Sequence, residues 1–252
     1  MSGHSHWATI KRSKGAADAK RGQLFTKLGR EIEIAARDGG GADVGSNFRL
    51  RLAVDKARQS AMPKENIERA ILRGTGQLKG DSIEQITYEG YGPQGTAVIV
   101  EVVTDNRNRA VSEVRKLFSR HGGNLGETGS VAWLFERKGC ISIVPKDGEA
   151  DELALVAIDT GADDVKVGQE LVEVYTRVED LQKIKAALEQ KQITVESAEL
   201  SWVPKTLMQL DGKATHQNMR LIDALEESDD IQAVYSNLEI SDEAMTAYQA
   251  ES

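Results

Sequence analysis

The sequence lacks several of the residues and segments that whole classes of protein depend on. Among its 252 residues there is one cysteine, Cys140, so no disulfide can form within the chain and we expect a reducing compartment. No stretch approaches the roughly 20 consecutive apolar residues of a membrane-spanning helix. The opening MSGHSHWATIKRSKG has no apolar run typical of a secretion signal. These absences predict a cytoplasmic protein with no membrane partner.

Recognisable catalytic motifs are also missing. His121 and His216 have no serine or cysteine placed with them in a nucleophile motif, and Cys140 lies in an apolar run typical of a buried strand. His4 and His6 resemble a pair of metal ligands, but no cysteine or third histidine nearby completes a site, and a basic arm is the simpler interpretation. We therefore predict no enzyme activity, no catalytic residue, no metal, no cofactor and no small-molecule substrate.

Two glycine-rich segments resemble nucleotide-binding motifs without meeting their requirements. Residues 90–95, GYGPQG, have the spacing G-x-G-x-x-G, but the β-branched run that follows predicts a strand where a dinucleotide site needs a helix. A hairpin turn is favoured there. Residues 122–129, GGNLGETG, lack the Lys-Ser/Thr ending of a P-loop. A structural loop is favoured for them, with a backbone anion site as the alternative.

Charge is divided unevenly along the chain, whose net charge is −8. Residues 1–80 contain 16 Lys and Arg against 8 Asp and Glu, a net charge of +8, whereas residues 81–252 contain 16 against 32, a net charge of −16. The first 30 residues alone hold seven basic residues and one acid, a net charge of +6. Charge runs are usually solvated surface, but a cationic segment on an anionic protein is typical of nucleic-acid binding.

Hydrophobic periodicity predicts an α+β fold. Three helices are expected in the first 78 residues, over 16–37, from Ser46 as N-cap, and from Pro63. The strands and helices expected after them form two α+β (ferredoxin-like) sandwiches, the second of which is inserted in the first. Strands are expected at residues 83–89, 96–104, 130–135, 140–144, 170–176, 194–202 and 231–238, and helices at 108–121, 151–160, 178–190 and 215–227. The predicted domains are residues 1–78 (basic arm and helical domain), 79–138 with 203–240, 139–202 (inserted), and a tail at 241–252.

Several segments resemble the YebC/PmpR family of probable transcriptional regulatory proteins. They are MSGHSHWATIKRSKGAADAKRGQLFTKL, MPKENIERAILRG, YEGYGPQGTAVIVEVVTDNRNRAVSEVR and FSRHGGNLGETGSVAWLFERKG. The family is related to the mitochondrial translational activator of cytochrome oxidase subunit one. The resemblance implies three domains, with the third inserted in the second, and a cytoplasmic protein that is not an enzyme. It implies a DNA-binding regulator or, as for other members, a ribosome-associated translation factor that relieves stalling at proline-rich stretches.

We predict that phosphates are bound by the basic residues of the first 30 positions, which are Lys11, Arg12, Lys14, Lys20, Arg21, Lys27 and Arg30. DNA is the first expectation, and ribosomal RNA on the ribosome is the alternative, because phosphate contacts do not depend on base sequence. No helix-turn-helix or zinc-finger pattern supplies base readout. Because binding residues tend to lie on loops, a second contact surface is predicted at Tyr91, Asn106, Arg107, Arg109 and Asn124.

Overall fold

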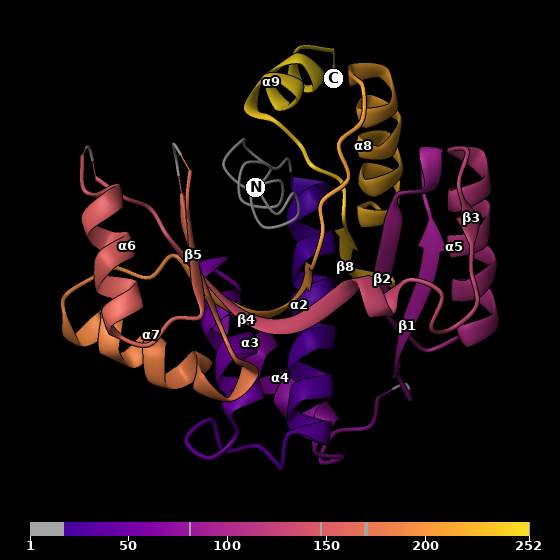
Figure 1. Ribbon diagram of the computed structural model, residues 1–252. Helices are drawn as coiled ribbons and strands as arrows, with labels where there is room; N and C mark the ends of the chain where they lie inside the picture. The colour runs from indigo at the N-terminus through magenta and orange to yellow at the C-terminus, as the bar shows by residue number, and fades with distance from the viewer. Residues whose placement is uncertain (1–17, 81, 147, 169–170, 252) are drawn as a thin grey trace. The chain divides into compact units, whose positions relative to one another are not determined.

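The computed structural model describes residues 18–80, 82–146, 148–168 and 171–251. Within these ranges the chain forms two compact units (Figure 1). The smaller unit runs from Phe135 to Lys205, and the larger unit comprises the described residues before and after it. Each unit contains one four-stranded sheet, in which neighbouring strands of the described residues pair antiparallel. Helices come first and two antiparallel sheets follow, which confirms the predicted α+β fold class.

The larger unit begins with three helices, α2 (Asp18–Asp38), α3 (Phe48–Gln59) and α4 (Lys64–Gly74). Their apolar stripes meet in one buried cluster that includes Leu28 and Ile32 of α2, Leu50 and Val54 of α3, and Ile67 of α4. Amphipathic helices bury such stripes together because each one alone would leave its apolar face in water. The helical region is therefore a small core of its own at the start of the larger unit.

The N-cap of α3 is Asn47, one residue after the predicted Ser46. The Asn47 Oδ1 atom accepts a hydrogen bond of 2.9 Å from Leu50 N, and the side-chain amide donates to the carbonyl oxygens of Ala35 and Gly41 at 2.8 and 2.9 Å. Ser46 instead donates its hydroxyl hydrogen to Asp43 Oδ2 at 2.9 Å. An asparagine can cap a helix while donating to two carbonyls, which a hydroxyl with one hydrogen cannot do.

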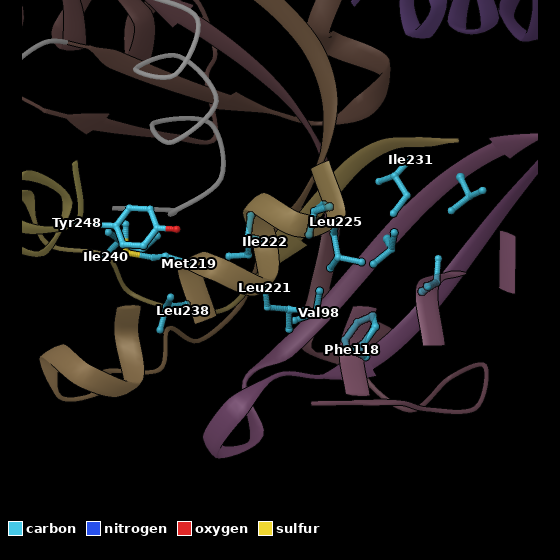
Figure 2. Close-up of a cluster of buried hydrophobic side chains, with 14 of the residues drawn as sticks. Val98, Phe118, Met219, Leu221, Ile222, Leu225, Ile231, Leu238, Ile240 and Tyr248 are labelled. Atoms are coloured by element: carbon cyan, nitrogen blue, oxygen red, sulfur yellow. The ribbon is translucent and has the colours of Figure 1, made fainter. Parts of the chain in front are cut away.

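The sheet of the larger unit has the strand order β3-β1-β2-β8. Its strands are β1 (Glu84–Tyr91), β2 (Ala97–Thr104), β3 (Asn124–Leu125) and β8 (Ile231–Ser236). Helices α5 (Arg107–Arg120) and α8 (Gly212–Glu226) pack against one face, where Val98, Phe118, Leu221 and Leu225 lie in the cluster shown in Figure 2. On the other face Val103 packs with Ile83 and with Ile34 of α2. Because both faces of β2 are covered, its apolar run is continuous rather than alternating.

Two segments of the larger unit differ from expectation. The strand predicted at residues 130–135 is absent, because residues 132–134 form a 3₁₀ turn and the strand β4 (Phe135–Ile143) begins only at Phe135. The segment set apart as a tail forms helix α9 (Asp242–Glu251), whose Met245 and Tyr248 are buried. The Tyr248 hydroxyl donates to Asp223 Oδ2 of α8 at 2.9 Å, which holds α9 in place.

The smaller unit has the chain order β-α-β-β-α-β of a ferredoxin-like sandwich. Its elements after β4 are α6 (Ala150–Asp159), β5 (Asp164–Val167), β6 (Val172–Thr176), the 3₁₀ turn η3 (Val178–Asp180), α7 (Leu181–Gln190) and β7 (Ser197–Pro204), and the strand order is β5-β6-β4-β7. Ile141, Val174, Leu181 and Ile184 are among its buried residues. The short strand β5 was not predicted, since four residues carry too little alternation to be recognised.

Candidate nucleic-acid interface

The predicted phosphate-binding residues fall into two groups. Lys11, Arg12 and Lys14 lie outside the described residues, and so does the side chain of Lys20. Arg21 is exposed near the start of α2, whereas Lys27 and Arg30 are half-buried along the same helix. The structure therefore describes three of the seven side chains, those of Arg21, Lys27 and Arg30 on α2. Lys27 and Arg30 differ from Arg21 because they are half-buried.

Lys27 donates to the carboxyl end of α8. Its Nζ atom lies 2.5 Å from the carbonyl oxygen of Glu226, and the side-chain amide of Gln23, one turn earlier on α2, donates to the carbonyl of Glu227. The last carbonyls of a helix have no partner within the helix and carry the negative end of its dipole, so a cation or an amide is favourable there. These contacts attach the helical region to the rest of the larger unit.

Arg30 is engaged more completely. One guanidinium nitrogen, Nη1, lies 2.8 Å from Oδ1 of Asp230, 2.8 Å from the carbonyl oxygen of Asp229 and 3.3 Å from that of Val103. The Arg30 side chain is 21% exposed, against 8% for Asp230. A guanidinium placed in this way holds α2 to the sheet and is poorly placed to reach a phosphate. We therefore leave Arg30 out of the proposed phosphate-binding set.

Asp230 is the centre of a charged network that sequence reasoning missed. Besides Arg30, its carboxylate accepts hydrogen bonds from Arg109 Nη2 and from the Thr104 hydroxyl, both at 2.9 Å. Burial alone would raise the pKa of Asp230, but the hydrogen bonds from Arg109, Thr104 and Arg30 outweigh burial and hold the pKa below its ordinary value. Asp230 follows several other acids in the sequence, and nothing in the pattern distinguishes it from them.

The residues of the predicted second surface do not come together in the described structure. Tyr91 and Asn124 are paired neighbours on β1 and β3, beside the carboxyl end of α5. Asn106, Arg107 and Arg109 lie at the other end of α5, where the Asn106 side chain accepts from Arg109 N as the N-cap. A helix of 14 residues spans about 20 Å, so the two groups cannot form one small site.

Most of these residues also have structural partners. The Tyr91 hydroxyl donates to the carbonyl of Ser130 at 2.9 Å, and Arg109 forms ion pairs with Asp105 at 2.6 Å and Asp230 at 2.9 Å. Arg107 is exposed, and so is Asn124. The loops of this region are thus held mainly by contacts within the protein.

The loop at residues 122–129 is anchored by an internal carboxylate. Glu89 is buried, and its two oxygens accept hydrogen bonds from the backbone N–H groups of Gly129, Val131 and Ala132 at 2.6, 2.8 and 2.7 Å. Burial raises the pKa of Glu89, but the three backbone hydrogen bonds lower it by more, so the pKa lies below its ordinary value. Three backbone N–H groups at the end of this loop and just beyond it are thus bound by a carboxylate of the protein itself, which supports a structural role for the loop.

The segment GYGPQG forms the turn between β1 and β2. Tyr91 pairs with Ala97 in the antiparallel register, and Gly92 N donates to the carbonyl of Thr96 at 2.8 Å. A strand follows the turn, so no helix N-terminus is available for a pyrophosphate. Among the described residues no group of three or more His, Cys, Asp or Glu could hold a metal ion, and no helix has the length and apolarity to cross a membrane. His4 and His6 lie outside the described residues.

Comparison with known proteins agrees with this architecture. A family model described as the TACO1/YebC protein N-terminal domain matches residues 5–77, and one described as the TACO1/YebC second and third domain matches residues 83–238. The chain belongs to the TACO1/YebC family. The family-level resemblance predicted from the sequence is therefore confirmed.

Members of this family align with the chain over nearly its whole length. A probable transcriptional regulatory protein of Dehalococcoides mccartyi is 51% identical over 251 residues, which cover 100% of both chains. A protein of the same description from Desulfosudis oleivorans is 52% identical over 96% of this chain and 98% of its own. The crystal structure of a conserved hypothetical protein from Aquifex aeolicus matches with a TM-score of 0.87 and 47% identity, covering 94% of this chain and 98% of that one.

Proposed function

We propose that this member of the TACO1/YebC family is a DNA-binding transcriptional regulator. In this proposal the cations of the N-terminal segment contact the phosphate backbone. They are Lys11, Arg12, Lys14, Lys20 and Arg21, with a smaller contribution from Lys27, because Lys27 also donates to the carbonyl of Glu226. The observation that carries the proposal is the separation of charge, from +8 in residues 1–80 to −16 in the remainder. The names of the relatives, probable transcriptional regulatory proteins, support a regulatory role at the level of the family.

The physical basis is the release of counterions. Each phosphate that a lysine or arginine neutralises frees part of the condensed cation atmosphere of DNA, so binding weakens with salt by a log–log slope of about −0.9 per contact. Such contacts position a protein on the duplex and carry no sequence information by themselves. The acidic remainder of the chain carries a net charge that DNA repels, which favours an approach led by the cationic segment.

The test is charge reversal in the cationic segment with a matched control. We expect that Lys11→Glu, Arg12→Glu, Lys14→Glu and Lys20→Glu together abolish binding to duplex DNA, measured by fluorescence anisotropy at several salt concentrations. The control reverses four exposed lysines of the acidic remainder, Lys146, Lys183, Lys191 and Lys213, and changes the net charge equally. Unchanged DNA binding in the first variant would contradict the proposal. So would cosedimentation of the wild type with ribosomes together with only weak, salt-sensitive binding to DNA.

A further inference from the structure

The outward face of α5 carries cations and no acid. At about 100° per residue, Asn108, Arg109, Ser112, Arg115, Lys116, Ser119 and Arg120 fall within an arc of about 140°. All seven are exposed. The one acid of the helix, Glu113, is half-buried and lies outside this arc. The opposite side is fixed by Ala110, Val114 and Phe118, which are buried in the core of the larger unit. Phe118 is labelled in Figure 2.

Three of these cations have no acidic partner among the residues that the structure describes. Arg109 forms ion pairs with Asp105 and Asp230. Within the described ranges, Arg115, Lys116 and Arg120 form no ion pair. Exposed cations without an ion pair also occur elsewhere among the described residues, for example Lys146, Lys183 and Lys191, so the distinguishing feature of α5 is that three of them share one helix face. Elsewhere in the larger unit, Lys56 forms an ion pair with Glu31, and Lys64 forms one with Glu68.

The helix dipole accounts for only part of this arrangement. A cation in the last turn of a helix is stabilised by the unpartnered carbonyls there, and Arg120 occupies that position. Arg115 and Lys116 precede the last turn, where the dipole contributes little. A further cation, Arg220 of α8, lies near the carboxyl end of α5. Burial lowers the pKa of His121, and the positive charges of Arg120 and Arg220 lower it further.

We propose that Arg115, Lys116 and Arg120 form a second phosphate-contact surface for duplex DNA. The inference rests on the proposed function and extends it to a second element of the larger unit. The residues 115–120 span about 8 Å along the helix, and phosphates of one strand follow one another every 3.4 Å or so along a duplex, so the three side chains can reach about two phosphates. The outward arc contains no aromatic side chain for stacking on bases, which favours a duplex over a single strand.

The experiment compares two variants of the full chain that lose the same charge. One combines Arg115→Gln, Lys116→Gln and Arg120→Gln, and the control combines Lys146→Gln, Lys183→Gln and Lys191→Gln. The probe is a fluorescently labelled 30-base-pair duplex DNA of random sequence, with a duplex RNA of equal length alongside. We expect the α5 variant to bind the DNA about tenfold or more weakly at 0.1 M salt, with a log–log salt slope reduced by about 2 units.

Several outcomes would overturn the inference, and they differ from those that test the proposed function. If the wild type fails to bind DNA at any salt concentration, the proposed function itself fails. If the wild type binds, the charge reversal of the N-terminal segment weakens binding and the α5 variant matches its control, only the α5 surface is excluded. A loss confined to the RNA duplex would also exclude it.

A second variant adds charge to the same arc. It changes a single exposed residue, so it tests the α5 surface even if the triple variant fails to fold. Ser119→Lys places a further cation beside Arg115 and Lys116 on the exposed side of the helix. We expect the salt slope on duplex DNA to steepen by about 0.9, with a thermal unfolding temperature equal to that of the wild type. An unchanged slope would count against the α5 surface.

Discussion

Arg30 Nη1 lies 2.8 Å from Asp230 Oδ1, and this contact joins two residues that are 200 positions apart in the sequence. Arg30 lies on α2, in the helical region, and Asp230 directly precedes β8, the last strand of the sheet. Through Arg109 and Thr104 the same carboxylate also contacts the start of α5 and the end of β2. A single buried carboxylate therefore connects the helical region with the sheet of the larger unit. The sequence had predicted these two parts as separate domains.

Asp230→Ala should destabilise the protein by about 2 to 4 kcal/mol. The substitution removes the shared acceptor and leaves the half-buried Arg30 guanidinium and the Thr104 hydroxyl without it. Chemical denaturation followed by circular dichroism measures the effect. Arg109→Gln serves as the comparison and should cost clearly less stability than Asp230→Ala, because the Arg109 side chain is 50% exposed and solvent screens its interactions. Equal losses for the two variants would contradict this ranking.

Arg30→Gln should lower stability without changing DNA binding. The variant loses contacts to Asp230 and to two backbone carbonyls, which we expect to cost about 1 to 2 kcal/mol. Arg12→Gln, by contrast, should reduce the salt slope of DNA binding by about 0.9. Anisotropy titrations and denaturation curves of both variants provide the check. If Arg30→Gln reduced the salt slope as Arg12→Gln does, Arg30 would belong in the phosphate-binding set after all.

Glu89→Gln should destabilise the loop at residues 122–129 and reduce the loss of stability in acid. The pKa of Glu89 is lowered in the folded protein, so its contribution is present at neutral pH and is lost as the pH falls through the folded pKa. Glutamine offers one carbonyl oxygen in place of two carboxylate oxygens, so at least one of the three N–H donors loses its acceptor, at a cost of about 1 to 3 kcal/mol.

The measurement for Glu89 is the free energy of unfolding between about pH 7 and pH 3, the range in which carboxylates are protonated. Glu127→Gln, exposed on the same loop, is the control and should follow the wild type. The difference between wild type and Glu89→Gln should be largest at pH 7 and should shrink as the pH is lowered. A difference that stayed constant with pH would show that the charge of Glu89 is not what stabilises the loop.

Gly74→Ala should destabilise the helical region by about 1 to 3 kcal/mol. A Cβ atom at residue 74 would lie 2.3 Å from the carbonyl oxygen of Glu33 and 2.9 Å from the Cβ of Ala36, both on α2, so the two helices would have to move apart. Gly22→Ala is the matched control, since its Cβ would meet nothing within 4 Å and alanine is the better helix former. We expect Gly22→Ala to stabilise by up to about 1 kcal/mol in thermal or chemical unfolding.

Much of the secondary structure could be predicted because its cause is local. The apolar stripe of residues 108–121 predicted α5 to within one residue at each end, and the run TAVIVEVVT predicted β2. Predictions failed where the cause lies elsewhere in the chain. Residues 130–134 have the composition of a strand, but Glu89 draws the backbone of Val131 and Ala132 into a turn. Asn47 caps α3 because the carbonyls of Ala35 and Gly41 lie next to it in the folded helical region.

By itself the sequence determined the sign and position of the charge, the amphipathic helices, the α+β class and membership of the family, since each of these depends on residues close together in the chain. Only the tertiary structure decided which cations are available. Lys27 and Arg30 were predicted to bind phosphate together with Arg21, yet they reach the end of α8 and Asp230 because α2 packs against the sheet. Likewise, Arg109 is paired while Arg115 and Lys116 are left facing solvent, because only Arg109 lies within reach of the buried carboxylate.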